Sequence, residues 1–174
     1  MKRISIAEEA VTTLLWTGYF PIAPATVASA LTCLIFWFPS EDFLKSIWTI
    51  LAIPVLAMLG VWLSNRYIEH YEVPENHRFK KLRRPNPKKG DPDPVVFDEF
   101  IGQWITLIAV PHTVLGFTAA FFIFRFLDIF KPLGINRTQT LAGGWGVMVD
   151  DVLAGIAGAA LIFAVLFFAP NLLG

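Results

Sequence analysis

The sequence predicts an all-α, membrane-embedded bundle of about six helices, on the basis of two observations. Of its 174 residues, 55% are hydrophobic and only 16% are charged, whereas an average soluble domain has about 25% charged residues. Long apolar runs are separated by prolines, glycines and short polar segments, which is typical of helices joined by loops. The length favours a single domain over residues 1–174.

Composition also excludes several kinds of site. The single cysteine, Cys33, rules out a disulfide within the chain and makes a zinc cluster implausible. Neither a Rossmann nor a P-loop glycine pattern is present, so we predict no nucleotide site, and we expect no nucleic-acid partner. Lys2 and Arg3 are followed by two glutamates rather than by a compact apolar segment, so we expect no signal peptide.

Three helices are predicted in the first half of the chain, at residues 5–16, 26–38 and about 43–68. Ser5 and Glu8 have the spacing of a capping box for the first helix. Ser40 is a suitable N-cap for the third, and Pro54 predicts a kink within it. The second helix is too short to cross a bilayer of about 30 Å.

A basic, proline-rich segment follows at residues 65–94, with its loop at about 69–94. It holds eight of the fourteen Lys and Arg residues. Such density beside an apolar span predicts the cytoplasmic side of a membrane. The segment is either an ordinary cytoplasmic loop or a surface that attracts anionic lipids, at about 1 kcal/mol per basic residue.

The second half predicts two short helices, 100–110 and 113–127, and a final apolar helix over 147–169. The last helix carries small residues, which allow close packing of helices in lipid, at Ala154, Gly155, Gly158 and Ala159. If the chain reverses at Pro111-His112, the ends of this hairpin lie on one side of the membrane with the basic segment. We expect His112 to be a turn residue there, and the loop before Thr26 to reach the same side.

Five carboxylates stand at the edges of the apolar runs, and we predict that they form one divalent-metal site. They are Asp98, Glu99, Asp128, Asp150 and Asp151. Ordinary helix capping is the alternative, with Asp98 as an N-cap and one of the last two acids as another. Helical neighbours differ by about 100°, so we expect Asp98 to face the metal and Glu99 to orient water or to bridge to a second ion.

Arg125, Asp128 and Lys131 share one helical face at i, i+3 and i+6. They form either local ion pairs, each contributing about 0.2–0.5 kcal/mol, or a site in which the cations hold phosphate and the acid binds metal. Oxygen ligands without a His or Cys cluster predict Mg²⁺. Carboxylates, Mg²⁺ and basic side chains together suit phosphoryl chemistry.

At these residues the sequence resembles the phosphatidylglycerophosphatase A family. The blocks that carry the resemblance are Asp91-Pro92 with 96–107, then 124–132, 143–155 and, more weakly, 18–29. Two features depart from the family pattern. Its Pro-Gly-Thr reads Pro24-Ala25-Thr26 here, and the basic segment is longer than expected. An alanine at this point resists a positive φ and a close approach of phosphate.

The resemblance implies a multihelical, Mg²⁺-dependent enzyme that hydrolyses phosphatidylglycerophosphate to phosphatidylglycerol and phosphate in glycerophospholipid biosynthesis. It implies a multi-pass protein of the inner membrane, in contact with anionic lipids and with its site on the cytoplasmic face. The five carboxylates would be catalytic metal ligands, and phosphate would bind Arg125, Lys131 and Thr26. Direct attack by water and transfer through an aspartate both remain open.

Two other classes of protein are weighed against this one. Carboxylates within a membrane also suit a non-enzymatic scaffold, or a subunit that relays ions or protons, although cations on either side of Asp128 fit that class less well. A CDP-alcohol phosphotransferase would also use carboxylate-bound metal, but its spaced-Asp motif is not found.

Overall fold

The computed structural model describes residues 5–70, 94–131, 141 and 143–173. Over these ranges the chain forms seven α-helices and one 3₁₀ turn, with no strand. The prediction of an all-α fold is confirmed, and the predicted number of about six helices is close to the number observed in the described residues. The elements are α1 (Ile6–Thr12), η1 (Thr17–Tyr19), α2 (Pro24–Trp37), α3 (Glu41–Leu44), α4 (Ile47–His70), α5 (Phe97–Leu107), α6 (Val114–Phe130) and α7 (Gly144–Phe168).

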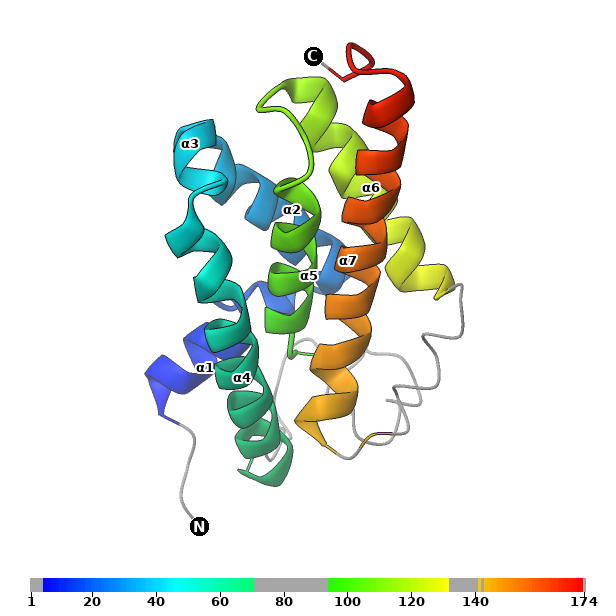
Figure 1. Cartoon of the computed structure of the whole chain (residues 1–174). Helices are drawn as coiled ribbons and strands as arrows, with labels where there is room; N and C mark the ends of the chain where they lie inside the picture. Colours follow the sequence, from blue (N-terminus) through cyan, green and yellow to red (C-terminus); the bar gives the residue numbers. More distant parts are fainter. Residues whose placement is uncertain (1–4, 71–93, 132–140, 142, 174) are drawn as a thin grey trace.

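Helix α5 is the centre of the bundle (Figure 1). It packs against α7, α2, α6 and α4. In the view of Figure 1, α5 and α7 both run upwards, whereas α4 and α6 run downwards. The beginnings of α5 and α7 therefore lie at the same end of the bundle as the end of α6, which is where the predicted acids stand.

Helix α1 begins as predicted and ends early. Ser5 and Glu8 form the capping box, but α1 stops at Thr12, where residue 16 was expected. Thr12 and Thr13 donate hydrogen bonds from their hydroxyls to the carbonyls of Glu8 and Glu9, at 2.7 and 2.8 Å. Such side-chain bonds satisfy backbone acceptors and compete with continuation of a helix. Residues 14–16 then turn with positive φ.

Helix α2 begins at Pro24, in the first-turn position that proline favours. Ala25 is therefore helical, and the positive φ belongs to Ala23, at 50°. An alanine at residue 25 thus causes no backbone strain at its own position.

The predicted helix 43–68 is divided into two in the structure. Ser40 does act as an N-cap, but for the short α3, where its hydroxyl accepts a hydrogen bond from the Phe43 N–H. The long helix α4 starts at Ile47 and continues through Pro54. The basic loop predicted at about 69–94 lies, apart from its ends, outside the described residues.

The predicted reversal at Pro111-His112 is present between α5 and α6. The His112 ring stacks on Trp37, with 5.0 Å between ring centroids, and its Nε2 lies 3.3 Å from the Phe36 carbonyl oxygen. His112 therefore fastens this turn to the end of α2, as expected for a turn residue. It lies at the opposite end of α5 from Asp98.

Helices α5 and α7 cross at two glycines. A Cβ at residue 102 would lie 2.6 Å from the Asp151 backbone oxygen, and one at residue 155 would overlap the Gly102 backbone. The Thr106 hydroxyl bridges the crossing, 3.1 Å from the Gly102 carbonyl oxygen and 3.3 Å from that of Gly155. The small-residue pattern predicted this close approach, which only helices without side chains at the contact can make.

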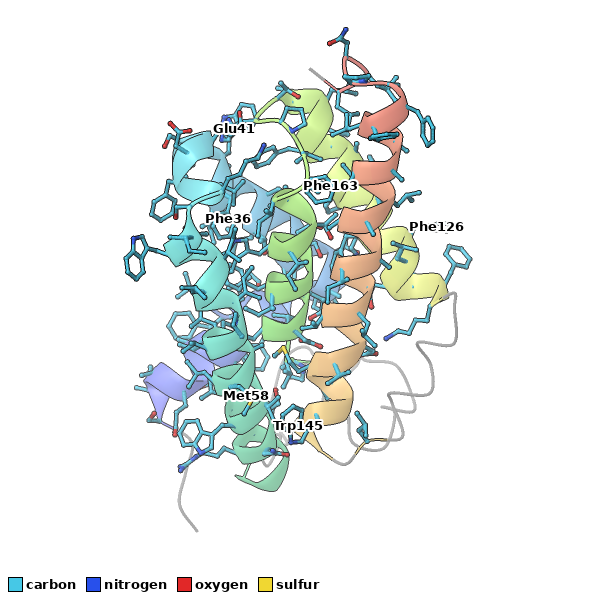
Figure 2. The ribbon with its side chains drawn as sticks, viewed as in Figure 1. Phe36, Glu41, Met58, Phe126, Trp145 and Phe163 are labelled. Atoms are coloured by element: carbon cyan, nitrogen blue, oxygen red, sulfur yellow. The ribbon has the colours of Figure 1, made fainter. Side chains whose placement is uncertain are left out.

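Two of the described helices are long and apolar enough to cross a membrane, Ile47–Tyr67 and Gly144–Phe168. Only 28% of the most apolar window of each is buried inside the molecule, so most of their apolar surface faces outwards. Figure 2 shows such side chains at Met58, Trp145 and Phe163. Exposed apolar surface of this extent is typical of contact with lipid or with other proteins.

The glycine crossing predicts a position-specific effect of alanine. Gly155→Ala forces a methyl group into the α5 backbone and should destabilise the fold by about 1–3 kcal/mol, the usual cost of overpacking. Gly158→Ala is the matched control on the same helix, because its Cβ would meet only side-chain atoms, the nearest being those of Thr106 at 3.1 Å.

The measurement is the thermal unfolding midpoint of each variant in detergent micelles. Alanine raises helix propensity by about 1 kcal/mol over glycine at both positions, so a lowered midpoint for Gly155→Ala reports packing alone. Equal midpoints for the two variants would contradict the close approach.

Candidate active site

Asp98 and Glu99 lie in the first turn of α5. The helix begins at Phe97 with Val96 at the N-cap, and no side chain caps it. The alternative that Asp98 is the N-cap is therefore wrong. The Val96 N–H donates to the Thr12 carbonyl at 3.1 Å, which fixes the start of α5 against the end of α1. Both carboxylates stand at the positive end of the helix dipole.

Asp150 and Asp151 lie within α7, two turns from its start. The sequence predicted a helix from residue 147 that these acids enter, but α7 begins at Gly144. Its start is fixed because the Gly144 N–H donates to the Asn65 side-chain oxygen on α4, at 2.8 Å. Gly143 turns into the helix with a φ of 61°. Neither acid is an N-cap, so capping does not explain them.

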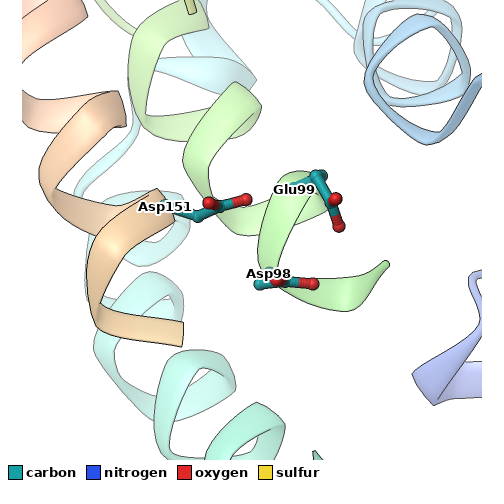
Figure 3. A group of neighbouring side chains, drawn as sticks. All are labelled: Asp98, Glu99 and Asp151. Atoms are coloured by element: carbon teal, nitrogen blue, oxygen red, sulfur yellow. The ribbon is translucent and has the colours of Figure 1, made fainter. Parts of the chain in front are cut away.

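Asp98, Glu99 and Asp151 converge (Figure 3). One carboxylate oxygen from each lies within 4.8 Å of the other two, an arrangement that could hold a metal ion. Asp98 and Glu99 thus both contribute to the group although they are neighbours on one helix; the separate roles expected for them, one facing the metal and the other orienting water or bridging to a second ion, remain predictions. Glutamate has one more methylene than aspartate, and the longer side chain of Glu99 makes up for its different direction on the helix.

Asp151 completes this group from α7. It is 3% exposed, and its Oδ2 has no hydrogen-bond partner among the residues that the structure describes. A buried carboxylate oxygen without a donor is costly. The glycine crossing places the Asp151 backbone beside Gly102, one turn from Asp98, and so brings the third carboxylate to the other two.

The second half of the site is an ion-paired group at the end of α6. The Arg125 Nη1 donates to the Asp128 carboxylate at 2.7 Å, and the Lys131 Nζ lies 3.6 Å from it. Lys131 also pairs with Asp150 on α7. It can do so because it ends α6 with a φ of 45°, which turns the chain and its ammonium back towards α7. The sequence predicted the local pairs but not this link.

The two halves form one cluster through Asp151. Its carboxylate lies close enough to Asp128, Glu99 and Asp150 to experience the charges of all three. Five side chains of this cluster are at most 9% exposed, namely those of Asp98, Arg125, Asp128, Asp150 and Asp151. Ionised, five carboxylates and two cations leave three net negative charges in a buried site.

The Lys131 ammonium is charged in this setting. Burial disfavours the charged form, but the hydrogen bond to Asp150 and the neighbouring carboxylates outweigh burial and raise the pKa of Lys131 above its usual value. Lys131 therefore holds a full positive charge at neutral pH.

Thr26, predicted to bind phosphate, lies in the first turn of α2. It lines a groove together with Arg125, so the structure places it on the side of that cation. The roles of Thr26 and of the other predicted site residues as ligands or catalysts remain predictions.

Sequence reasoning gave no role to Gln103, which follows Glu99 by one helical turn. Gln103 is fully buried, and neither atom of its amide has a hydrogen-bond partner within the described ranges. The available signal was a glutamine within the mainly apolar part of the helix that follows Asp98 and Glu99. Its amide adds a neutral donor and acceptor to the α5 face that carries Glu99.

The donor set suits a hard divalent cation. Its three carboxylates offer only oxygen, the ligand that Mg²⁺, Ca²⁺ and Mn²⁺ prefer. Oxygens bound to one Mg²⁺ at about 2.1 Å are at most about 4.2 Å apart, so small side-chain rotations would bring the group to binding distance. Such an ion would give the Asp151 oxygen a partner and would offset the surplus of negative charge.

Several named proteins are similar in sequence to this chain. Among named relatives, a protein of Bacteroides thetaiotaomicron, provisionally named as a phosphatidylinositol-3-phosphatase, is 36% identical over 169 residues, or 93% of this chain and 95% of that protein. Phosphatidylglycerophosphatase A of Escherichia coli is 33% identical over 84% of this chain and 76% of its own. The Haemophilus influenzae enzyme of that name is 42% identical over 42% of this chain and 47% of its own.

No solved structure matches the chain. The sequence model of one family, described as phosphatidylglycerophosphatase A, matches residues 10–166. That range contains all five carboxylates, both cations and Thr26. The chain therefore belongs to the phosphatidylglycerophosphatase A family.

Proposed function

We propose that this protein is a Mg²⁺-dependent lipid phosphatase that converts phosphatidylglycerophosphate to phosphatidylglycerol and inorganic phosphate. The observation that carries the proposal is the carboxylate group Asp98–Glu99–Asp151, buried except for the half-buried Glu99, beside the paired cations Arg125 and Lys131. Family membership supports the reaction, because two relatives are named for it.

The charge balance supports the metal. Three net negative charges in a buried site are unfavourable and must be offset by protons or by a cation. They would also repel a phosphate dianion. Asp98, Glu99 and Asp151 would hold one divalent ion, which would offset most of the surplus and would supply charge neutralisation at the phosphate and activation of water.

The cations can serve the substrate without leaving their carboxylates. A guanidinium has five N–H donors, and Arg125 uses Nη1 on Asp128 while its Nε lacks a partner in the described structure. The Lys131 ammonium has three donors and faces Asp128 and Asp150. Both can therefore hold phosphate oxygens while the carboxylates fix their direction. Thr26 would add a hydroxyl from α2.

The proposed reaction is the hydrolysis of a phosphate monoester by water. A water oxygen forms a bond to phosphorus as the bond from phosphorus to the glycerol oxygen breaks. One water proton ends on the leaving alcohol, and the other remains with the phosphate. In such transfers catalysis is mostly positioning and charge neutralisation, which the buried acids and cations supply.

The setting we propose is a multi-pass protein of the inner membrane with its site on the cytoplasmic face. The outward apolar surface of α4 and α7 supports contact with lipid. The basic residues of the segment between α4 and α5 favour the cytoplasmic side and anionic lipids. The place of the reaction in glycerophospholipid synthesis follows from the product.

Substrate choice is the first test. Purified protein in mixed micelles should release phosphate from phosphatidylglycerophosphate, and only with Mg²⁺ present. Phosphatidylinositol 3-phosphate is the second candidate, because the Bacteroides thetaiotaomicron relative carries that name. Phosphate release measured for both lipids, with Mg²⁺ and with EDTA, separates them. No release from any lipid phosphate would favour a scaffold or an ion-relay subunit.

Asp128→Asn tests the ion-paired half of the site. The change removes the charge that orients Arg125 and Lys131, and we expect turnover to fall by about 100-fold or more, the range seen when one charge-stabilising group is removed. The fold should persist, because asparagine keeps the size of the side chain. The control is Asp42→Asn, an exposed carboxylate in α3. Near-normal turnover by Asp128→Asn would remove Asp128 from the site.

Metal binding can be measured without turnover. Mg²⁺ that binds only the folded protein raises its stability, by about 2.7 kcal/mol at 100 times the dissociation constant. We expect Mg²⁺ to raise the thermal midpoint of the wild type and of Asp42→Asn, but not that of Asp151→Asn. An equal rise in all three proteins would place the metal elsewhere.

A further inference from the structure

We propose that a groove beside the active site holds an acyl chain of the lipid substrate, an inference that rests on the proposed function. This Arg125 groove has a volume of about 550 Å³ and lies between α6, α7 and the start of α2. Its apolar walls include Phe122, Phe126, Ile129 and Leu161, and its two polar lining residues are Thr26 and Arg125.

The groove begins at the catalytic cluster. Arg125, which lines it, is also the partner of Asp128 at 2.7 Å. A phosphate held by Arg125 would therefore sit at the polar edge of an apolar channel. Phosphate and acyl chains are joined through glycerol in a phospholipid, so one molecule can fill both places. Arg125 lines the groove with the apolar part of its side chain, while its guanidinium points to Asp128, and the buried Nε lacks a partner among the described residues.

The apolar walls are open to the surroundings. Phe122 is 64% exposed, Ile129 61% and Leu161 47%, and Figure 2 shows Phe126 pointing away from the bundle. Side chains this apolar and this exposed are in contact with the hydrocarbon of a bilayer when the helices lie in one. An acyl chain could thus enter sideways while its phosphate reaches Arg125.

A second groove provides an internal comparison. The Trp145 groove, between α4, α5 and α7, has a similar volume of about 520 Å³. Its lining includes Met58, Trp145, Ile156 and Phe163, and none of its lining residues is charged or belongs to the predicted site. Ordinary bilayer lipid could occupy either groove, but only the Arg125 groove joins an apolar channel to a cation of the cluster.

The proposal is tested by placing a larger side chain in each groove. Leu161→Trp narrows the Arg125 groove, and Ile156→Trp does the same to the Trp145 groove. Leu161 and Ile156 have the same size, lie on the same helix α7 and are 47% and 51% exposed. Ile156→Trp is therefore a matched control for Leu161→Trp. Each variant is assayed on dioleoyl phosphatidylglycerophosphate and on its deacylated, water-soluble counterpart.

We expect Leu161→Trp to lower kcat/KM for the dioleoyl lipid by about tenfold, at the low end of what apolar pocket changes cause, and to leave the deacylated compound unaffected. Ile156→Trp should change neither. Three results would overturn the proposal that the groove holds an acyl chain. Leu161→Trp could lower kcat/KM equally for both substrates, or for neither. Ile156→Trp could lower kcat/KM for the dioleoyl lipid as much as Leu161→Trp does. A wild type that hydrolyses neither substrate would overturn the proposed function itself.

A second measurement does not depend on turnover. Phosphatidylglycerophosphate with a photoreactive diazirine in one acyl chain is crosslinked to the wild type in EDTA, and the labelled peptides are identified by mass spectrometry. We expect labels within residues 121–129, displaced by unlabelled substrate but not by phosphatidylcholine. Labels confined to the Trp145 groove would place the acyl chain there instead. Labels displaced equally by phosphatidylcholine would show that the Arg125 groove holds ordinary lipid. Either result would overturn the proposal.

Discussion

The contact of Gly102 with Gly155 is the constraint on which the active site depends. Because neither residue has a side chain, the backbones of α5 and α7 meet directly at this crossing. Helix α7 therefore presents Asp151 to the first turn of α5, where Asp98 and Glu99 stand. With larger residues the helices would separate by the width of a side chain, and three carboxylates within 4.8 Å of one another would no longer be possible. The chemistry thus requires a packing feature that takes no part in it.

Much of this arrangement could be predicted from sequence, because local signals determine it. Ser5 and Glu8 cap α1, the pair Pro111-His112 reverses the chain, and small residues mark the face of α7 that packs closely. The hairpin argument needed only helix length, since a single straight span from Asp98 to Asp128 would have separated acids that the structure brings together.

The remaining details depend on contacts between segments far apart in sequence. Asn65 on α4 fixes the start of α7 at Gly144, so Asp150 and Asp151 became interior residues of the helix. A left-handed Lys131 connects α6 to Asp150, a pairing that no spacing within α6 could indicate. The convergence of Asp98 with Glu99 depended on side-chain length, which an argument from helical angle alone ignores.

The site combines two environments that seldom meet. Surplus negative charge is unfavourable in a buried, apolar setting, and the same charge attracts a divalent cation more strongly there than in water. Arg125 belongs to both environments, since it pairs with Asp128 and lines an apolar groove. A water-soluble phosphate needs only the charged half of such a site. A substrate with a phosphate at one end and hydrocarbon at the other would use both the charged cluster and the apolar groove, which supports the proposal of a lipid phosphate over a soluble one.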